Sequence, residues 1–253
     1  MPLLALDTSA AISVAVLLGD GRVVERNLLE FRLHAEQLSV VIAAALAGAG
    51  VTPTDLTGIA VGTGPGPFTG LRIGLAAART LAFVLDVPLY GVCSLDALAA
   101  QAIQQLELAP DTELIVATDA RRREVYWAQY LVVPSWAETL PTHSAPDKAP
   151  KPLANPHTSI WPAYSAAPLS LVGPRVSKPD SVEQELAAIL PNTIVGQGTL
   201  LYPDALPATQ GAPALPSAAA LGQIALSRAQ LGIEQPTDPL YLRRPDIHGV
   251  PVG

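Results

Sequence analysis

Cysteine is almost absent from the sequence: Cys93 is the only one in 253 residues. One cysteine cannot form an intrachain disulfide and cannot supply a Cys-x-x-Cys redox or metal motif. The first apolar run is interrupted by Asp7 and has no charged segment before it, which is not typical of a signal peptide. These absences predict a cytoplasmic protein in a reducing compartment, with Cys93 as a small buried residue.

Positive charge is also scarce. Charged residues make up only 15% of the chain, and the net charge is −7. The basic clusters at 121–123 and 243–244 are short, and we interpret them as solvated surface. Because no global positive field would displace counterions from a phosphate backbone, we expect only weak binding of the isolated chain to nucleic acid.

The signatures of common catalytic sites are missing as well. The four histidines do not pair at helical spacing, and Leu38 stands four residues after His34, where a second metal ligand would be needed. The sequence contains no Gly-x-Ser-x-Gly elbow. We therefore expect no catalytic residue, no metal site and no cofactor-binding residue in this chain.

The order of the predicted elements indicates an α/β protein with two ribonuclease-H-like lobes. The first lobe is predicted to have a strand at 3–9, a hairpin at 11–30, a helix at 34–50, a strand at 56–64, a helix at 69–86, a strand at 87–92 and a helix at 94–106. An aspartate near the end of the first strand is typical of this lobe, and Asp7 stands there. A similar opening at 111–120 carries Asp119, so we predict the duplicated superfold of actin, hexokinase and Hsp70.

The predicted domains follow from this duplication. The N-terminal lobe covers 1–106 and is completed by a helix at 217–232. The second lobe covers 107–214 and contains a proline-rich insertion at about 134–168, of which 141–160 is aperiodic and expected to be dispensable. Further strands are predicted at 124–133, 170–174 and 192–198, with a helix at 181–190. Residues 233–253 form an extended C-terminal tail.

The stretch VGTGPGPFTGLRIG precedes the predicted 69–86 helix and has two interpretations. A phosphate cradle needs consecutive backbone N–H groups, but Pro65 and Pro67 have none, and no lysine follows as in a Walker loop. We favour a rigid turn that sets the helix angle, with Thr69 as a candidate N-cap; a phosphate loop stays the alternative. The residues of this helix-positioning loop are Gly64, Pro65, Gly66, Pro67, Phe68, Thr69 and Gly70.

Small residues recur every four positions on both helices of the N-terminal lobe. Such stripes let helix backbones approach closely. The helices could pack only on their own sheet, or part of both faces could meet a partner; we favour the partner. The candidate interface is Ala35, Ser39, Ala43 and Ala47 on the first helix and Gly70, Gly74, Ala78 and Ala82 on the second. On this hypothesis Gly74→Leu would prevent association and leave the monomer stable.

Several segments together resemble the TsaB (YeaZ) family: LLALDTSAAISVAVL, HAEQL, GTGPGPFTGLRIGLAAARTLA, VPLYGVCSLDALA, TDARRREVYWAQY and PLYLRRPD. The resemblance covers most of 1–133 and the C-terminal part, and it fails over 134–168. Pro67 stands where the family usually has serine, which removes a hydroxyl from the loop.

The resemblance implies a non-catalytic scaffold role in making threonylcarbamoyladenosine at position 37 of tRNA. Members of this family work as homodimers or in a complex with the catalytic subunit TsaD and the ATPase TsaE, and they pair through the two N-lobe helices. Contact with tRNA would occur only through the complex, with no membrane involved. Whether a nucleotide binds at a subunit interface stays open.

Two other classes also stay open. One is an ATP-dependent small-molecule kinase of the same superfold, and the other is a glycoprotease-like metallopeptidase. ATP turnover by the isolated chain would favour the first, and a bound metal would favour the second.

Overall fold

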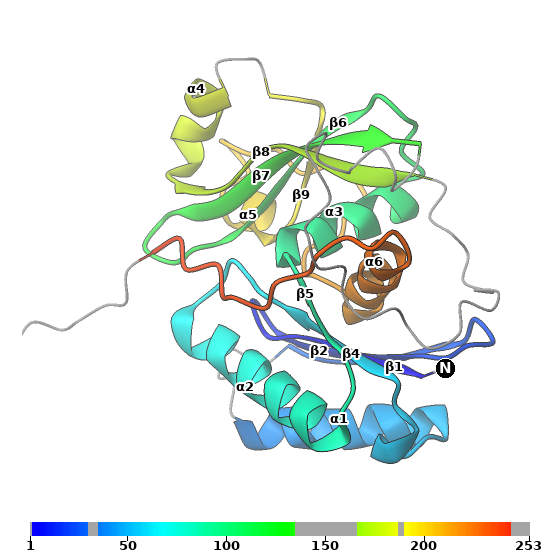
Figure 1. Cartoon of the computed structure of the whole chain (residues 1–253). Helices are drawn as coiled ribbons and strands as arrows, with labels where there is room; N and C mark the ends of the chain where they lie inside the picture. The colour runs from blue at the N-terminus through cyan, green and yellow to red at the C-terminus, as the bar shows by residue number, and fades with distance from the viewer. Residues whose placement is uncertain (1, 30–34, 135–165, 187–189, 244–253) are drawn as a thin grey trace, which may run out of the picture.

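The computed structural model of the chain describes residues 2–29, 35–134, 166–186 and 190–243. Within them the chain forms two β-sheets with helices between and outside them (Figure 1). The two sheets, with α3 and α6 between them, form the layered core of the two-lobed α/β fold that the sequence predicts.

The first sheet has five strands in the order β3-β2-β1-β4-β5. The strands are β1 (Leu3–Asp7), β2 (Ile12–Leu17), β3 (Val23–Leu28), β4 (Gly58–Gly62) and β5 (Leu89–Val92). The first three form an antiparallel meander, and β4 and β5 add to it in parallel. The predicted hairpin is confirmed, since Gly21 has φ +88° in the turn between β2 and β3.

The second sheet has four strands in the order β8-β7-β6-β9. They are β6 (Glu113–Asp119), β7 (Val125–Val133), β8 (Ala167–Ser177) and β9 (Thr193–Val195). Here too three antiparallel strands come first, and the fourth pairs in parallel with the opening strand. The repeated topology, with Asp7 and Asp119 at the ends of the two opening strands, is that of the duplicated superfold of actin, hexokinase and Hsp70.

The helices are divided between the faces of these sheets. On the outer face of the first sheet lie α1 (Ala35–Ala49) and α2 (Phe68–Leu85), and its other face is covered by α6 (Ala218–Gln230). Against α6 packs α3 (Ser94–Gln105), which also contacts the second sheet. The remaining helices are the short α4 (Val182–Leu186) and α5 (Gln197–Leu201), with single 3-10 turns η1 (Pro53–Asp55) and η3 (Pro179–Ser181).

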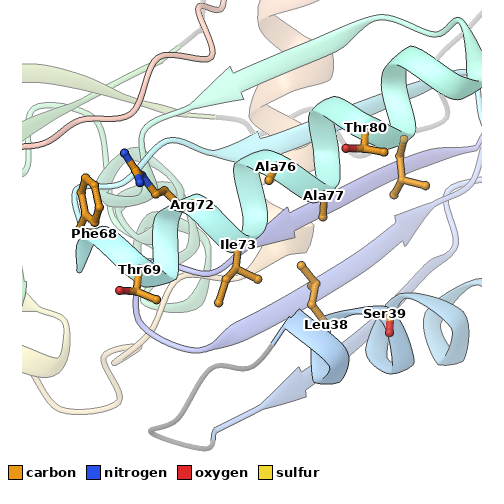
Figure 2. A pocket seen from close by; sticks show the side chains of 10 residues that line it. Leu38, Ser39, Phe68, Thr69, Arg72, Ile73, Ala76, Ala77 and Thr80 are labelled. Atoms are coloured by element: carbon orange, nitrogen blue, oxygen red, sulfur yellow. The ribbon is translucent and has the colours of Figure 1, made fainter.

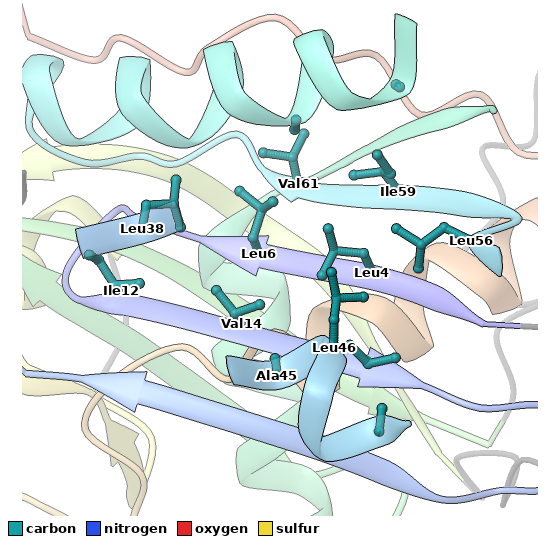
Figure 3. Close-up of a cluster of buried hydrophobic side chains, with 14 of the residues drawn as sticks. Leu4, Leu6, Ile12, Val14, Leu38, Ala45, Leu46, Leu56, Ile59 and Val61 are labelled. Atoms are coloured by element: carbon teal, nitrogen blue, oxygen red, sulfur yellow. The ribbon is translucent and has the colours of Figure 1, made fainter. Parts of the chain in front are cut away.

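The largest apolar core cluster lies between the first sheet and the α1–α2 pair. Figure 3 shows Leu4, Leu6, Val14 and Val61 of the strands pointing toward Leu38 and Leu46 of α1. All are buried. At about 25 cal/mol per Å² of buried apolar area, such packing is the main stabilising term for this layer. It fixes which side of α1 and α2 faces inward and therefore which side stays open.

The C-terminal half departs from its prediction at several element boundaries. The predicted strand at 192–198 is β9 followed by the unpredicted helix α5, because Gly196 with φ +102° turns the chain between them. The third strand of the second sheet is longer than predicted and starts at Ala167, so the predicted insertion ends two residues too late. Residues 135–165, 187–189 and 244–253, including most of the insertion and the end of the tail, lie outside the described residues.

By length and composition alone α2 could cross a membrane, and it is the one helix in the described ranges of which this is true. This is weak evidence, because core helices of soluble proteins meet the same criteria. One side of α2 is packed on the first sheet, through buried residues that include Leu71, Leu75 and Ala78.

Candidate functional site

The glycine–proline loop leads from β4 into α2, which begins at Phe68. Ser94 N–H donates to the Gly64 carbonyl at 2.7 Å, and Gly64 N–H donates to the Ser94 hydroxyl at 3.2 Å, so the loop is tied to the start of α3. Gly64 has φ +92°. A β-carbon on Gly66 would lie 2.8 Å from the Ser9 carbonyl oxygen, so only glycine fits there. This anchoring agrees with a turn that positions the helix, which stays a prediction.

The predicted N-cap of the helix after the loop is wrong. Thr69 is the second residue of α2, and Pro67 is its N-cap residue, without a side-chain cap. Ser94 is the first residue of α3. Its hydroxyl is used by Asp7 and Gly64, because both groups are buried beside it and need a partner.

The small-residue stripe on α2 does not face outward, which corrects half of the predicted interface. Gly70, Gly74, Ala78 and Ala82 are all buried against the sheet of their own lobe. Thr8 Oγ1 donates to the Gly70 carbonyl at 2.8 Å, and a β-carbon on Gly74 would overlap Thr8 Oγ1. The absence of a side chain at Gly74 is therefore needed for close packing of α2 on the end of β1.

On α1 the predicted stripe is exposed. Ser39, Ala43 and Ala47 face away from the core, and Ala35 is the first residue of the helix. Large apolar side chains are also exposed on both helices: Val40 of α1 is 68% exposed, and on the outer side of α2 Phe83 is 86% and Val84 71% exposed. Exposed side chains of this size on two neighbouring helices are typical of a protein interface.

An apolar groove of about 700 Å³ runs between α1 and α2. Figure 2 shows Ile73 of α2 and Leu38 of α1 pointing toward each other in it, and Arg72 and Phe68 at the N-terminal end of α2. The described lining residues are Leu38, Ser39, Phe68, Thr69, Arg72, Ile73, Ala76, Ala77, Thr80 and Leu81. We call the outer side of both helices, with this groove, the α1–α2 face.

Asp7 and Asp119 have equivalent roles in the two lobes. The Asp7 Oδ1 atom accepts from the Ser9 N–H at 2.8 Å, and the Asp119 Oδ1 atom accepts from the Arg121 N–H at 2.8 Å. Each aspartate therefore closes a turn two residues beyond its strand, the usual behaviour of Asp in turns. The remaining Asp7 oxygen accepts from Ser94, and that of Asp119 pairs with the Arg121 guanidinium at 3.2 Å.

The turn after Asp119 has an uncommon backbone. Arg121, Arg122 and Arg123 have φ of +62°, +52° and +61°, a left-handed conformation that costs non-glycine residues about 1 kcal/mol or more each. The bonds from Asp119 stabilise it, together with the Glu124 N–H that donates to the Arg121 carbonyl at 3.0 Å. The turn borders a small hollow of about 220 Å³ between the lobes, also lined by Ser9, Ala10, Pro67, Thr69, Gly70 and Gln197.

Burial changes the acid–base properties of Asp7 and Cys93. It raises the pKa of Asp7 above the ordinary 3.8, although hydrogen bonds from Ser9 and Ser94 oppose the change. It also raises the pKa of the Cys93 thiol, which favours the unreactive protonated form. In the part of the chain that the structure describes, no three His, Cys, Asp or Glu side chains come together as a metal site.

The raised pKa of Asp7 gives a pH-dependent prediction. When a carboxyl has a higher pKa in the folded state than in the unfolded state, the free energy of unfolding falls as the pH rises from the unfolded-state pKa to the folded-state pKa. Asp7→Asn removes this titration, so the free energy of unfolding of the variant minus that of the wild type should increase with pH above about 4. Urea unfolding at several pH values measures it.

Asp20→Asn is the matched control. Asp20 is exposed in the β2–β3 turn, and hydrogen bonds from Arg22 lower its pKa. The stabilisation that Asp20 contributes is present above its unfolded-state pKa and is lost as the pH falls. For Asp20→Asn, the free energy of unfolding of the variant minus that of the wild type should therefore decrease with rising pH. If the difference in free energy of unfolding between Asp7→Asn and the wild type does not vary with pH, then burial does not disfavour the charged form of Asp7.

Comparison with known proteins agrees with the geometry of this fold. A family model described as "TsaD: tRNA N6-adenosine threonylcarbamoyltransferase" matches residues 29–246. The solved structure of YeaZ from Pseudomonas aeruginosa is 29% identical, with a TM-score of 0.68 over 95% of this chain and 99% of that one.

Curated relatives match over a shorter range. The tRNA threonylcarbamoyladenosine biosynthesis protein TsaB of Escherichia coli is 36% identical over 130 residues, 51% of this chain and 55% of that protein. An uncharacterized protein of Mycobacterium tuberculosis is 47% identical over 130 residues, 50% of this chain and 58% of that protein. The chain thus spans about half the length of the curated relatives it matches.

The fold and its paired aspartate turns define a two-lobed α/β protein of the actin, hexokinase and Hsp70 superfold. The chain belongs to the threonylcarbamoyltransferase family of the TsaD model and, within it, to the TsaB (YeaZ) family.

Proposed function

We propose that this protein is a non-catalytic scaffold subunit of the tRNA adenosine-37 threonylcarbamoyl transferase complex and that it pairs with TsaD through the α1–α2 face. The observation that carries the proposal is this open apolar face, where Phe83 and Val84 are largely exposed beside an apolar groove. Membership of the TsaB (YeaZ) family supports the pathway. We also propose a cytoplasmic location.

The geometry of the hollow between the lobes supports a scaffold more than an enzyme. Asp7 is buried and bonded to three donors, and the Asp119 carboxylate is paired with Arg121. Neither is presented as a free ligand for a metal–nucleotide complex. Within the described residues nothing favours the kinase or metallopeptidase alternatives, so we propose neither. TsaE, tRNA and any interface nucleotide would then meet this chain only in the complex.

The proposal predicts that activity needs both chains. The isolated protein should neither hydrolyse ATP nor modify tRNA, and a mixture with TsaD and TsaE from the same organism, supplied with tRNA, ATP and an activated threonylcarbamoyl donor, should form threonylcarbamoyladenosine. Co-purification of the chain with TsaD measures their association, and mass spectrometry of tRNA nucleosides measures the modification. Turnover of ATP by the pure chain, abolished by Asp7→Ala, would contradict the scaffold role. Flotation of the chain with lipid vesicles, without TsaD binding, would assign the apolar face to a membrane instead.

A further inference from the structure

The C-terminal strap, residues 233–243, connects the two lobes. The Gly91 N–H of β5 donates to the Gln235 carbonyl at 3.1 Å, and the Leu240 N–H donates to the Thr63 carbonyl at 2.9 Å, which fixes the strap to the first sheet. At its far end, Arg243 Nη1 donates to the Ala120 carbonyl at 2.8 Å in the second lobe. Arg243 also forms an ion pair with a glutamate of the same turn, Glu124. The strap is thus fixed at both ends.

The strap also contacts α2, at its middle and at its start. Arg79 Nη2 of α2 donates to the Thr237 carbonyl at 2.8 Å. The ring of Tyr241 lies against the ring of Phe68, with centroids 4.9 Å apart and planes at 39°. On the same Phe68 ring lies the Arg72 guanidinium, with its central carbon 3.8 Å from the ring centroid. We call these three side chains the Tyr241–Phe68–Arg72 stack.

This stack holds a cation at the end of the apolar groove. Arg72 is the one charged residue among the described residues that line the groove. None of the ion pairs in the described part of the chain involves it. Stacking on a ring uses the face of a guanidinium and leaves its N–H edges free, and those edges match a carboxylate with two parallel hydrogen bonds.

We propose that Arg72 binds a carboxylate of the protein that docks on the α1–α2 face, and that the strap is a positioning element that holds Arg72 ready through Tyr241 and Phe68. The inference rests on the proposed function, because it names the chemistry of the partner at that same face: an aspartate or glutamate next to its apolar contact residues. A guanidinium already held in place loses less side-chain freedom when the partner binds.

Calorimetric titration of TsaD with the full chain tests this inference. Arg72→Gln should weaken binding about tenfold, as for arginines at interface hot spots, and should reduce its dependence on salt. Tyr241→Ala should weaken binding several-fold, and the double variant should bind no worse than Arg72→Gln, because both changes remove the same interaction. Tyr241→Phe keeps the ring and should bind like the wild type.

Arg175→Gln is the charge control. Arg175 lies in β8 of the second lobe and is about half exposed, so its loss should leave TsaD binding unchanged. Wild-type affinity for Arg72→Gln would overturn the carboxylate assignment. If the losses of TsaD affinity from Arg72→Gln and Tyr241→Ala multiply in the double variant, while the unfolding midpoints stay unchanged, the two side chains act independently. That result would overturn the role of the strap. A wild-type chain that does not bind TsaD would overturn the proposed function itself, and this inference with it.

Discussion

Gly74→Leu is expected to destabilise the folded protein strongly. A β-carbon at Gly74 would overlap Thr8 Oγ1 and lie 3.4 Å from Leu6 Cδ1, and Thr8 cannot move without losing its hydrogen bond to the Gly70 carbonyl. Overpacking costs about 1–3 kcal/mol or more, and a lost buried hydrogen bond costs about 1–3 kcal/mol in addition. For a chain of this size that lowers the melting temperature by roughly 5–15 °C in thermal unfolding.

Ala76→Leu is the matched control on the same helix. Ala76 is exposed and lines the groove, so the larger side chain meets solvent in the monomer and should leave the melting temperature nearly unchanged. This expectation reverses the one drawn from the sequence alone, in which Gly74→Leu spares the fold. A stable Gly74→Leu monomer would show that α2 does not pack on β1 as described.

Ala76→Glu is expected to have the largest effect on association with TsaD. In the free chain the carboxylate stays in water, so folding should be preserved. In the complex it would be buried among apolar groove residues such as Ile73 and Ala77, and at four residues after Arg72 it would take the guanidinium that the partner's carboxylate needs. One carboxylate would then be buried without a partner, which costs about 3 kcal/mol or more and weakens binding roughly a hundredfold. Equilibrium titration with TsaD measures the change, and circular dichroism confirms the fold.

Much of the fold could be predicted from the sequence because its signals are local. Apolar strands, the Asp20-Gly21 turn and the alternation of helices and strands all act over a few residues. The two lobes followed from a repeated pattern with an aspartate at the end of each opening strand. The structure adds that Asp7 and Asp119 close equivalent turns, which gives both a structural role.

The orientation of the α2 stripe could not be predicted in the same way. A repeat of small residues at every fourth position shows that something approaches closely, but it does not say whether this is a sheet of the same chain or a partner. Thr8, which occupies the space at Gly74, is 66 positions away in sequence. The exposed Phe83 and Val84 on the other side of the helix were missed, because an apolar run in sequence does not show which residues face solvent.

The contacts of the strap were missed for a related reason. Tyr241 and Phe68 are far apart in sequence, and neither belongs to a motif with a known spacing, so only the folded chain shows that their rings meet. The start of β8 at Ala167 likewise depends on pairing with β7, which lies more than 30 residues away in sequence. Sequence patterns located the α1–α2 pair, and tertiary packing decided which of its faces is open.

Binding of TsaD to the α1–α2 face can be tested with one paired titration. Ala76→Glu places a charge in the groove, and Leu171→Glu places the same charge on β8 of the second lobe, where Leu171 is 45% exposed. We expect TsaD to bind Leu171→Glu with wild-type affinity, and we expect binding to Ala76→Glu to be lost or weakened about a hundredfold. Wild-type affinity of TsaD for Ala76→Glu, with the fold intact, would contradict binding of TsaD at this face.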